Sequence, residues 1–496
     1  MPKIRTSASL QAEIIIIMLD SINIRLPRNA ALSSSSSSPP NPHASRIVRV
    51  RKSTSVAAAA SLPASLPASL PASLPLTSLA PDSMGWSLLL AARILASVYE
   101  GKSLSEALLV LAKEPPVARA AAQDVAYGVL RRYGQGEFIL GRLMSKPSTH
   151  PETQALLQGA LYRLETRPDS AAMVVDQAVV AAGEIAGGAF KGLVNGVLRN
   201  YLRQRESLLA AMAADEEANY RHPRWWLTRL RRAYRENWQS IVAAGNSPPP
   251  MTLRVNQRLG TVADYATKLK AAGLSARPVG GQGLILQKPV SVEALPGFFD
   301  GYVSVQDAGA QRAAELLAPA PGARVLDACA APGGKTAHLL EAADLDLLAL
   351  DIDASRTKRI EENLQRLGLQ ATVKVADCNE AERWWDGRPF DAILADVPCS
   401  ASGVVRRHPD IKHLRRESDI RRFVHTQAAI LDALWLLLKP GGKLLYATCS
   451  VFPEENAAQI DAFLVRQSGV KRLAEEQLLP QDDNDGFYYA LLQKPV

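Results

Sequence analysis

The fold is decided by one stretch, V-L-D-A-C-A-A-P-G-G-K-T at residues 325–336. A short apolar run at 324–326 predicts a buried parallel strand, which an acid, Asp327, closes. A turn of small residues with two glycines follows, and a helix is expected from about Thr336. This order lets a backbone and a helix N-terminus approach a ligand closely, as nucleotide-type cofactors require. A glycine turn after a strand is equally compatible with tight strand–helix packing.

Strands and helices alternate beyond this turn, which predicts an α/β doubly wound, Rossmann-like sheet. Strands are expected at 345–350, 372–375, 392–395 and 443–448, and a helix at 354–367. Five side chains follow these strands closely: Asp351, Asp377, Asp396, Cys399 and Cys449. Because ligands bind at the carboxyl ends of parallel strands, we expect all five along one edge of the sheet.

The acid after the second strand indicates the type of cofactor. Asp351 lies about twenty residues beyond the glycine turn, where an acid accepts hydrogen bonds from ribose hydroxyls. The turn lacks the G-x-G-x-x-G spacing that receives a pyrophosphate. An adenosine cofactor without phosphate, S-adenosyl-L-methionine, therefore fits better than a dinucleotide. Asp377 would lie near the adenine amine, although a surface acid ending a short strand is the alternative.

The chain contains four cysteines: Cys329, Cys378, Cys399 and Cys449. Their spacing and the absence of a histidine cluster argue against a metal site. Cysteines without secretory features are typical of reduced, cytoplasmic proteins. Cys399 and Cys449 follow strands beside the cofactor turn, which favours a nucleophilic role over inert packing. Cys329 and Cys378 are expected to be structural thiols.

The composition of the chain bears on whether it binds nucleic acid, carries a disordered extension or spans a membrane. The net charge is +8, but residues 1–80 supply +6 of it, so nucleic-acid binding has to rest on local patches. Residues 1–83 contain a serine run and Ser-Leu-Pro-Ala repeats, which predict a disordered extension. An organelle leader or a misassigned start, with Met84 as the true beginning, are the alternatives. No apolar run reaches the ~18 residues needed to span a membrane.

Two regions precede the sheet. Apolar residues recur at helical spacing from 86 to about 209, which predicts an all-α bundle of five or more helices. Residues 221–235 then hold six arginines and no acid, with Trp225, Trp226 and Tyr234 between them. Either this stretch contacts RNA, or it is an amphipathic helix that packs its tryptophans on a neighbouring domain.

Several motifs resemble those of the RNA cytosine-5 methyltransferases. They are the 326–336 turn, D-V-P-C-S-A-S-G-V-V-R-R-H-P at 396–409 and Y-A-T-C-S-V-F-P-E-E-N at 446–456. G-L-V-N-G-V-L-R at 192–199 resembles the helical domain of the NusB antitermination factor. With the closing D-G-F-Y-Y-A at 485–490, the resemblance is to the bacterial 16S rRNA enzymes of the Fmu/Sun (RsmB) type and covers about 86–494.

The residue patterns and this resemblance together divide the chain into five regions. They are a disordered extension at 1–83, a NusB-like RNA-binding domain at 84–212, a basic-aromatic helical linker at 213–247, a small α/β RNA-binding subdomain at 248–310, and a methyltransferase domain at 311–496. The resemblance also implies that S-adenosylmethionine is bound by Cys329, Ala330, Ala331, Pro332, Gly333, Gly334, Lys335, Asp351, Asp377 and Asp396. Cys449 would be the nucleophile, and Cys399 would assist product release. One departure is Asn379, where the family usually has arginine two residues after the Asp377 position.

The implied reaction is methylation of cytosine C5 in 16S rRNA, through addition of a thiolate at C6. The expected partner is 16S rRNA, with no DNA and no membrane, and the protein is expected to be a monomer. Five basic residues after Cys399 could hold RNA phosphates or simply be solvated: Arg406, Arg407, Lys412, Arg415 and Arg416. Pro453-Glu454-Glu455 is expected only to start a helix.

Other functions remain as alternatives. A non-catalytic RNA-binding assembly factor would not need both thiols and the cofactor turn. A cytosine-5 methyltransferase acting on another RNA would share every motif. A DNA enzyme would carry a large inserted recognition segment, and an amino-methyltransferase would have an aromatic residue in place of Cys399.

Overall fold

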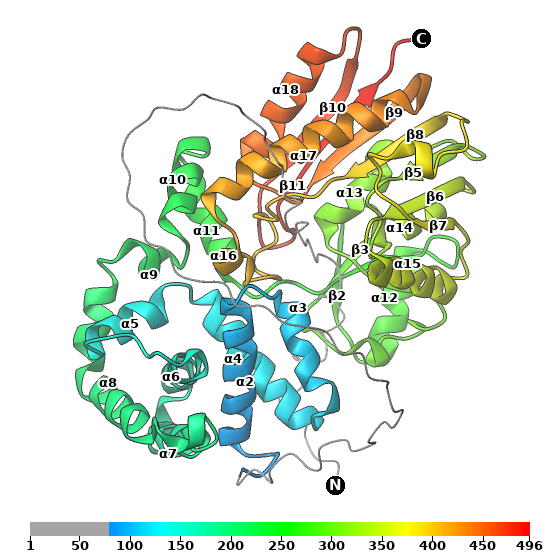
Figure 1. Ribbon diagram of the computed structural model, residues 1–496. Coiled ribbons are helices and arrows are strands. Elements are labelled where there is room, and N and C mark those ends of the chain that lie inside the picture. The colour runs from blue at the N-terminus through cyan, green and yellow to red at the C-terminus, as the bar shows by residue number, and fades with distance from the viewer. Residues whose placement is uncertain (1–78) are drawn as a thin grey trace, which may run out of the picture. The chain divides into compact units, whose positions relative to one another are not determined.

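The computed structural model describes residues 79–496 (Figure 1). The predicted extension at 1–83 lies almost wholly outside the described residues. The first part is helical, and its helices are α2 (Met84–Tyr99), α3 (Leu104–Ala107), α4 (Pro116–Arg131), α5 (Gln135–Leu143), α6 (Pro151–Thr166), α7 (Ala171–Ala182) and α8 (Lys191–Met212). The predicted all-α bundle is confirmed.

Helix α2 lies at the centre of this bundle. Ser83 caps its N-terminus by accepting a hydrogen bond from the backbone N–H of Trp86. Leu88, Leu89, Ile94 and Leu95 are fully buried against α4, α6 and α7 (Figure 1). Burial on every side of α2 explains why its sequence is apolar almost throughout.

Three shorter helices follow the bundle: α9 (Glu216–Tyr220), α10 (Arg224–Ala233) and α11 (Trp238–Asn246). A small four-stranded antiparallel sheet comes next, in the order β2-β3-β1-β4. Its strands are β1 (Thr252–Val255), β2 (Ala276–Val279), β3 (Gly283–Leu286) and β4 (Val303–Val305), and α12 (Val262–Ala271) packs against β2 and β3. The two edge strands have weak sequence signals, because β2 contains Pro278 and β4 has only three residues.

The last part is built on a seven-stranded sheet in the order β10-β11-β9-β8-β5-β6-β7. Its strands are β5 (Arg324–Asp327), β6 (Asp346–Asp351), β7 (Thr372–Val375), β8 (Phe390–Asp396), β9 (Leu438–Thr448), β10 (Lys471–Leu478) and β11 (Phe487–Gln493). The strands from β9 to β7 in this order pair in parallel, whereas β11 pairs antiparallel with both of its neighbours, β9 and β10. The fold is therefore the predicted Rossmann-like sheet with an unpredicted antiparallel edge.

Helices cover both faces of this sheet (Figure 1). Those on one face are α13 (Ala308–Leu317), α14 (Gly334–Ala342) and α15 (Ala354–Leu367), and those on the other are α17 (Glu417–Leu436) and α18 (Ala457–Arg466). Along β8, Ala392 and Leu394 join the first core, and Ile393 and Ala395 join the second. This alternation is what a strand buried on both faces requires.

The chain after Cys399 does not lie on the surface. The buried amine of Lys412, in α16 (Ile411–Leu414), donates hydrogen bonds to the carbonyls of Arg131 and Arg221 and to Asn246 Oδ1, at 3.0, 3.0 and 3.1 Å. Asp410 Oδ2 accepts from the backbone N–H of Leu104 at 2.9 Å. We call these contacts the Lys412 clasp, because they fasten this loop to α3, α4 and the helices after the bundle.

Three of the five basic residues predicted to hold phosphates are therefore unavailable to RNA. Arg406 is buried and ion-paired with Asp485, and Arg407 pairs with Asp485 and Asp307. Lys412 is buried in the clasp. For these three residues both alternatives, phosphate binding and solvation, were wrong, because a tertiary contact buries side chains that a local pattern assigns to solvent. Only Arg416 is exposed, and Arg415 is partly buried.

Candidate active site

The turn at 328–333 connects β5 to α14 and is fixed to the neighbouring strand. The backbone N–H of Ala330 donates to Leu350 O at 2.7 Å, and that of Ala331 donates to Asp351 Oδ2 at 3.2 Å. Gly333 has φ +95°, and a Cβ there would lie 3.1 Å from the Cα of Ile360 in α15. Only glycine suits this position, since both the backbone conformation and the close approach exclude a side chain.

Asp351, at the end of β6, is buried beneath this turn. Its Oδ2 supports Ala331, and its Oδ1 accepts from the backbone N–H of Asp353 at 3.1 Å. Each carboxylate oxygen has a second lone pair, so the side chain can hold the turn and still accept a bond from a ligand hydroxyl.

A cavity of about 590 Å³ lies beside Asp351, at the ends of β6 and β7. The apolar side chains of Ile352 and Val375 line it, and these residues are 65% and 54% exposed. Asp377 lines the same cavity, and its Oδ1 accepts bonds from the backbone and side-chain amides of Asn379, both at 2.9 Å. Asn379 thus orients the acid. The charged residues Lys374, Glu380 and Arg383 also line the cavity, so it offers both apolar contacts for a base and polar groups for its edge, as the adenine of an adenosine cofactor requires. Ile352 was missed by the sequence analysis.

Lys335 and Asp396 form an ion pair at the centre of the sheet edge. Lys335 Nζ lies 2.6 Å from Asp396 Oδ2. Burial lowers the pKa of this lysine, but the charges of Asp396, Cys449 and Asp327 raise it by more, so the net shift is upward. Lys335 and Asp396 were both predicted to bind the cofactor, and the structure brings them together.

The two predicted reactive cysteines lie together. Cys399 Sγ and Cys449 Sγ are 3.4 Å apart, although fifty residues separate them. Both are buried, at 1% and 7% exposure. Burial raises the pKa of the Cys399 thiol well above its ordinary value, and its hydrogen bond to Cys449 and the nearby Glu455 carboxylate raise it further.

The other two cysteines, Cys329 and Cys378, are not bonded in a disulfide. Contact with Cys378 and burial raise the pKa of Cys329 well above its ordinary value. The Cys329 thiol therefore stays protonated, as expected of a structural cysteine.

Asp327, at the end of β5, is a further buried acid near the site. Its Oδ2 accepts from Thr336 Oγ1 at 2.7 Å, while its Oδ1 has no hydrogen-bond partner among the described residues. Burial raises the pKa of Asp327 to about 7, and the charges of Asp396 and Asp351 act in the same direction. The sequence identified Asp327 only as the acid that closes the strand.

The aromatic side chains of residues 221–235 pack against other parts of the protein and do not face the solvent. Trp226 is buried against Phe452, and Tyr234 donates its hydroxyl to Val451 O at 2.8 Å. Arg229 pairs with Glu417 at 3.3 Å and with Glu454. The packing alternative therefore holds for the aromatic side chains, and the exposed arginines are Arg224, Arg232 and Arg235.

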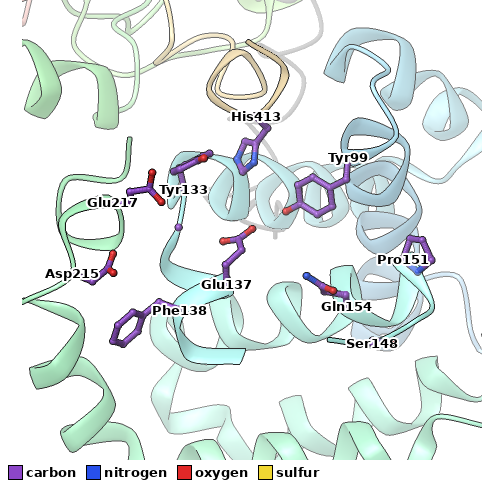
Figure 2. A pocket seen from close by; sticks show the side chains of 11 residues that line it. Tyr99, Tyr133, Glu137, Phe138, Ser148, Pro151, Gln154, Asp215, Glu217 and His413 are labelled. Atoms are coloured by element: carbon purple, nitrogen blue, oxygen red, sulfur yellow. The ribbon is translucent and has the colours of Figure 1, made fainter. Parts of the chain in front are cut away.

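A second cavity, of about 490 Å³, lies where α5, α6 and α9 approach α16 (Figure 2). His413 projects into it between Tyr99 and Tyr133, and burial lowers the pKa of His413 to about 3, so the ring is neutral (Figure 2). Three carboxylates, Glu137, Asp215 and Glu217, line the cavity without any lysine or arginine from the described residues. Its negative charge makes it unsuitable for RNA phosphates.

Comparison with known proteins places this chain, with its Rossmann-like sheet, among the RNA methyltransferases. The chain belongs to the 16S rRNA methyltransferase RsmB/F family, whose family model matches residues 314–493. A ferredoxin-like domain of RsmF/B-like methyltransferases matches 222–293, and the NusB family matches 87–203. The ferredoxin-like match begins inside the stretch that the sequence analysis assigned to a linker.

Curated relatives match along nearly their whole length. Ribosomal RNA small subunit methyltransferase B of Vibrio cholerae is 44% identical over 428 residues, 83% of this chain and 99% of the relative. The Salmonella arizonae protein of the same name is 46% identical, covering 82% of this chain and 98% of the relative. Among solved structures, PH0851 superposes with a TM-score of 0.71 at 23% identity over 84% of this chain and 99% of its own, which supports the fold.

Residues 79–496 contain no helix with the length and apolar character needed to cross a membrane.

Proposed function

We propose that the protein transfers a methyl group from S-adenosylmethionine to C5 of a cytosine in 16S rRNA, through a covalent adduct between Cys449 and C6. The observation that carries the proposal is the 3.4 Å separation of the Cys399 and Cys449 sulfurs. A single thiol at a sheet edge is compatible with packing, but two adjacent thiols beside a cofactor turn match a reaction that needs one to attack and one to assist.

The reaction follows from the chemistry of the base. Cytosine C5 is a poor nucleophile until a thiolate adds at C6 and leaves electron density on C5. S-adenosylmethionine held by the turn would supply an electrophilic methyl group for C5, and its S–CH3 bond would break to leave S-adenosylhomocysteine. A base then removes the C5 proton, and the bond between C6 and Cys449 breaks to release the product. Cys399 lies close enough to assist these last steps.

Electrostatics favours Cys449 as the attacking thiol. Cys399 has a carboxylate neighbour, Glu455, and a strongly raised pKa. The raised pKa keeps the Cys399 thiol protonated, which supports a proton-holding role for Cys399 and favours Cys449 as the nucleophile.

The proposed cofactor site consists of the turn from Cys329 to Lys335 together with Asp351, Asp377 and Asp396. Asp351 would accept from the ribose hydroxyls. The cavity lined by Ile352 and Val375 would take the adenine, with Asp377 at its amine.

The proposed RNA substrate rests on the relatives' names and on the domains before the sheet. A target cytosine has to be unpaired, or turned out of its stack, for C6 to reach a thiol that is only 7% exposed. We propose that the helical domain at 84–212 and the small sheet at 248–310 hold the surrounding RNA.

The test uses single-cysteine variants with 16S rRNA and S-adenosylmethionine. Cys449→Ala should give neither product nor adduct. Cys399→Ala should attack and methylate but stall, so that a protein–RNA adduct accumulates on a denaturing gel only when the cofactor is present. Cys378→Ala, a buried thiol away from the pair, is the matched control and should behave as the wild type. The reverse pattern, with adduct in Cys449→Ala, would overturn the assignment, and no methyl transfer by the wild type would favour the assembly-factor alternative.

A further inference from the structure

Each reactive cysteine is followed by a serine, and both serines bind the same carboxylate. Glu455 Oε2 accepts from Ser400 Oγ at 2.5 Å and from Ser450 Oγ at 2.6 Å. Its Oε1 accepts from the backbone N–H of Ser400 at 2.8 Å and from Gln427 Nε2 at 3.1 Å. One side chain thus joins the loop after β8 to the loop after β9.

The backbone around Glu455 is itself held in place. Tyr446, in β9, donates its hydroxyl to Glu455 O at 2.7 Å. The next residue, Asn456, accepts from Thr448 Oγ1 at 2.6 Å and donates to Ser450 O at 2.9 Å. Because Thr448 and Ser450 flank Cys449, the turn that carries Glu455 also fixes the loop of the proposed nucleophile.

Burying a carboxylate costs free energy of desolvation, so the buried position of Glu455 calls for a structural explanation. Glu455 is fully buried and makes no ion pair within residues 79–496. Burial raises the pKa of its carboxyl, while the hydrogen bonds from Ser400 and Ser450 oppose that rise. Four donors are enough to satisfy both oxygens, and all but Gln427 belong to the two cysteine loops.

We propose that Glu455 is a positioning residue, which sets the distance between Cys399 and Cys449 by holding the serine that follows each of them. The carboxylate does not touch the substrate. Its effect on the reaction passes through the two thiols, and this part of the inference rests on the proposed two-thiol mechanism.

Disulfide formation measures the thiol separation without any methylation. Oxidation of Cys399 and Cys449 releases two protons and two electrons, which an azodicarboxamide oxidant such as diamide accepts as it becomes a hydrazine. The sulfurs have to approach from 3.4 Å to the ~2.05 Å of a disulfide. The rate, followed by peptide mapping of the Cys399–Cys449 bridge, therefore reports how well the loops are held together.

Glu455→Ala removes the shared acceptor and should slow bridge formation at least tenfold. It should lower kcat by at least tenfold, with KM for RNA and affinity for S-adenosylhomocysteine changed less than twofold. Glu455→Gln retains one acceptor oxygen and gains an amide that can donate to the serine hydroxyls, so it should restore both rates to within about threefold of wild type. Glu454→Ala, at the partly exposed neighbouring glutamate, is the matched control and should change neither rate.

A wild-type bridging rate in Glu455→Ala would overturn the proposal. If that variant does not fold, Ser450→Ala decides, because it removes one hydroxyl only: slower bridging supports the role of Glu455, and an unchanged rate refutes it. A wild-type protein that forms the bridge rapidly but transfers no methyl group would refute the proposed function and leave the positioning role standing.

Discussion

The buried carboxyl of Asp327 should make the stability of the protein fall as pH rises. Burial raises its pKa to about 7 in the folded protein, against ~3.9 for an unfolded aspartate. The folded state therefore binds this proton more tightly, so its contribution to stability is complete below pH ~4 and is lost as pH rises through 7. A shift of about three units corresponds to about 4 kcal/mol, of which about 3 kcal/mol is lost between pH 5 and pH 8.

Asp327→Asn places a neutral group at the same position and removes this dependence. Its amide oxygen can still accept from Thr336, while its NH₂ replaces an oxygen that has no partner. An unsatisfied donor costs ~1–3 kcal/mol, but this offset does not vary with pH. The difference in unfolding free energy between variant and wild type should therefore move by about 3 kcal/mol in favour of the variant from pH 5 to pH 8.

Urea unfolding followed by tryptophan fluorescence, without cofactor, measures this difference. Asp386→Asn is the control: Asp386 is exposed and its pKa is lowered, chiefly by a backbone hydrogen bond from Arg388. Asp386 is ionised in both states above pH 5, so its difference from wild type should stay constant. A difference for Asp327→Asn that also stays constant, within ~0.5 kcal/mol, would show that the carboxyl is ionised in the folded protein.

Three further outcomes are expected. Asp351→Ala should weaken S-adenosylhomocysteine binding by about 1.5–3 kcal/mol in calorimetry, and an unchanged affinity would remove Asp351 from the proposed site. Arg224→Ala with Arg232→Ala should lower RNA affinity and flatten its salt dependence by up to ~2 in slope without changing cofactor affinity, whereas an unaltered slope would mean that this exposed face does not contact RNA. Lys412→Met should destabilise the protein by about 3–5 kcal/mol, since three buried acceptors lose their donor, and an unchanged urea midpoint would contradict the importance of the clasp.

Elements with local signals could be predicted from the sequence. Helix α15 and strand β7 have the predicted bounds, because Gly368 ends the helix and a short β-branched run makes the strand. The meeting of Cys399 with Cys449 followed from topology alone, since both come just after parallel strands and such strands share one edge.

Residues whose surroundings are set by distant segments could not be predicted. Glu454 and Glu455 are adjacent acids after a proline and look alike as the first turn of a helix. Glu454 is partly exposed and pairs with Arg229, whereas Glu455 turns inward to the two serines. The basic residues after Cys399 show the same limit, because their burial depends on acids and carbonyls far away in sequence. No local pattern separates such side chains from solvated ones.

The Lys412 clasp has a consequence for engineering. A truncated protein that begins at about residue 248 would lack the carbonyls of Arg131 and Arg221 and the Asn246 amide. Lys412 would then lose its three acceptors and become exposed to solvent. The loop after Cys399 would keep its ion pairs to Asp485 and Asp307 but lose every contact of the clasp. Chimeras that exchange the N-terminal helical domain between relatives should therefore transplant the 400–414 loop together with it, because the Lys412 clasp connects the two parts.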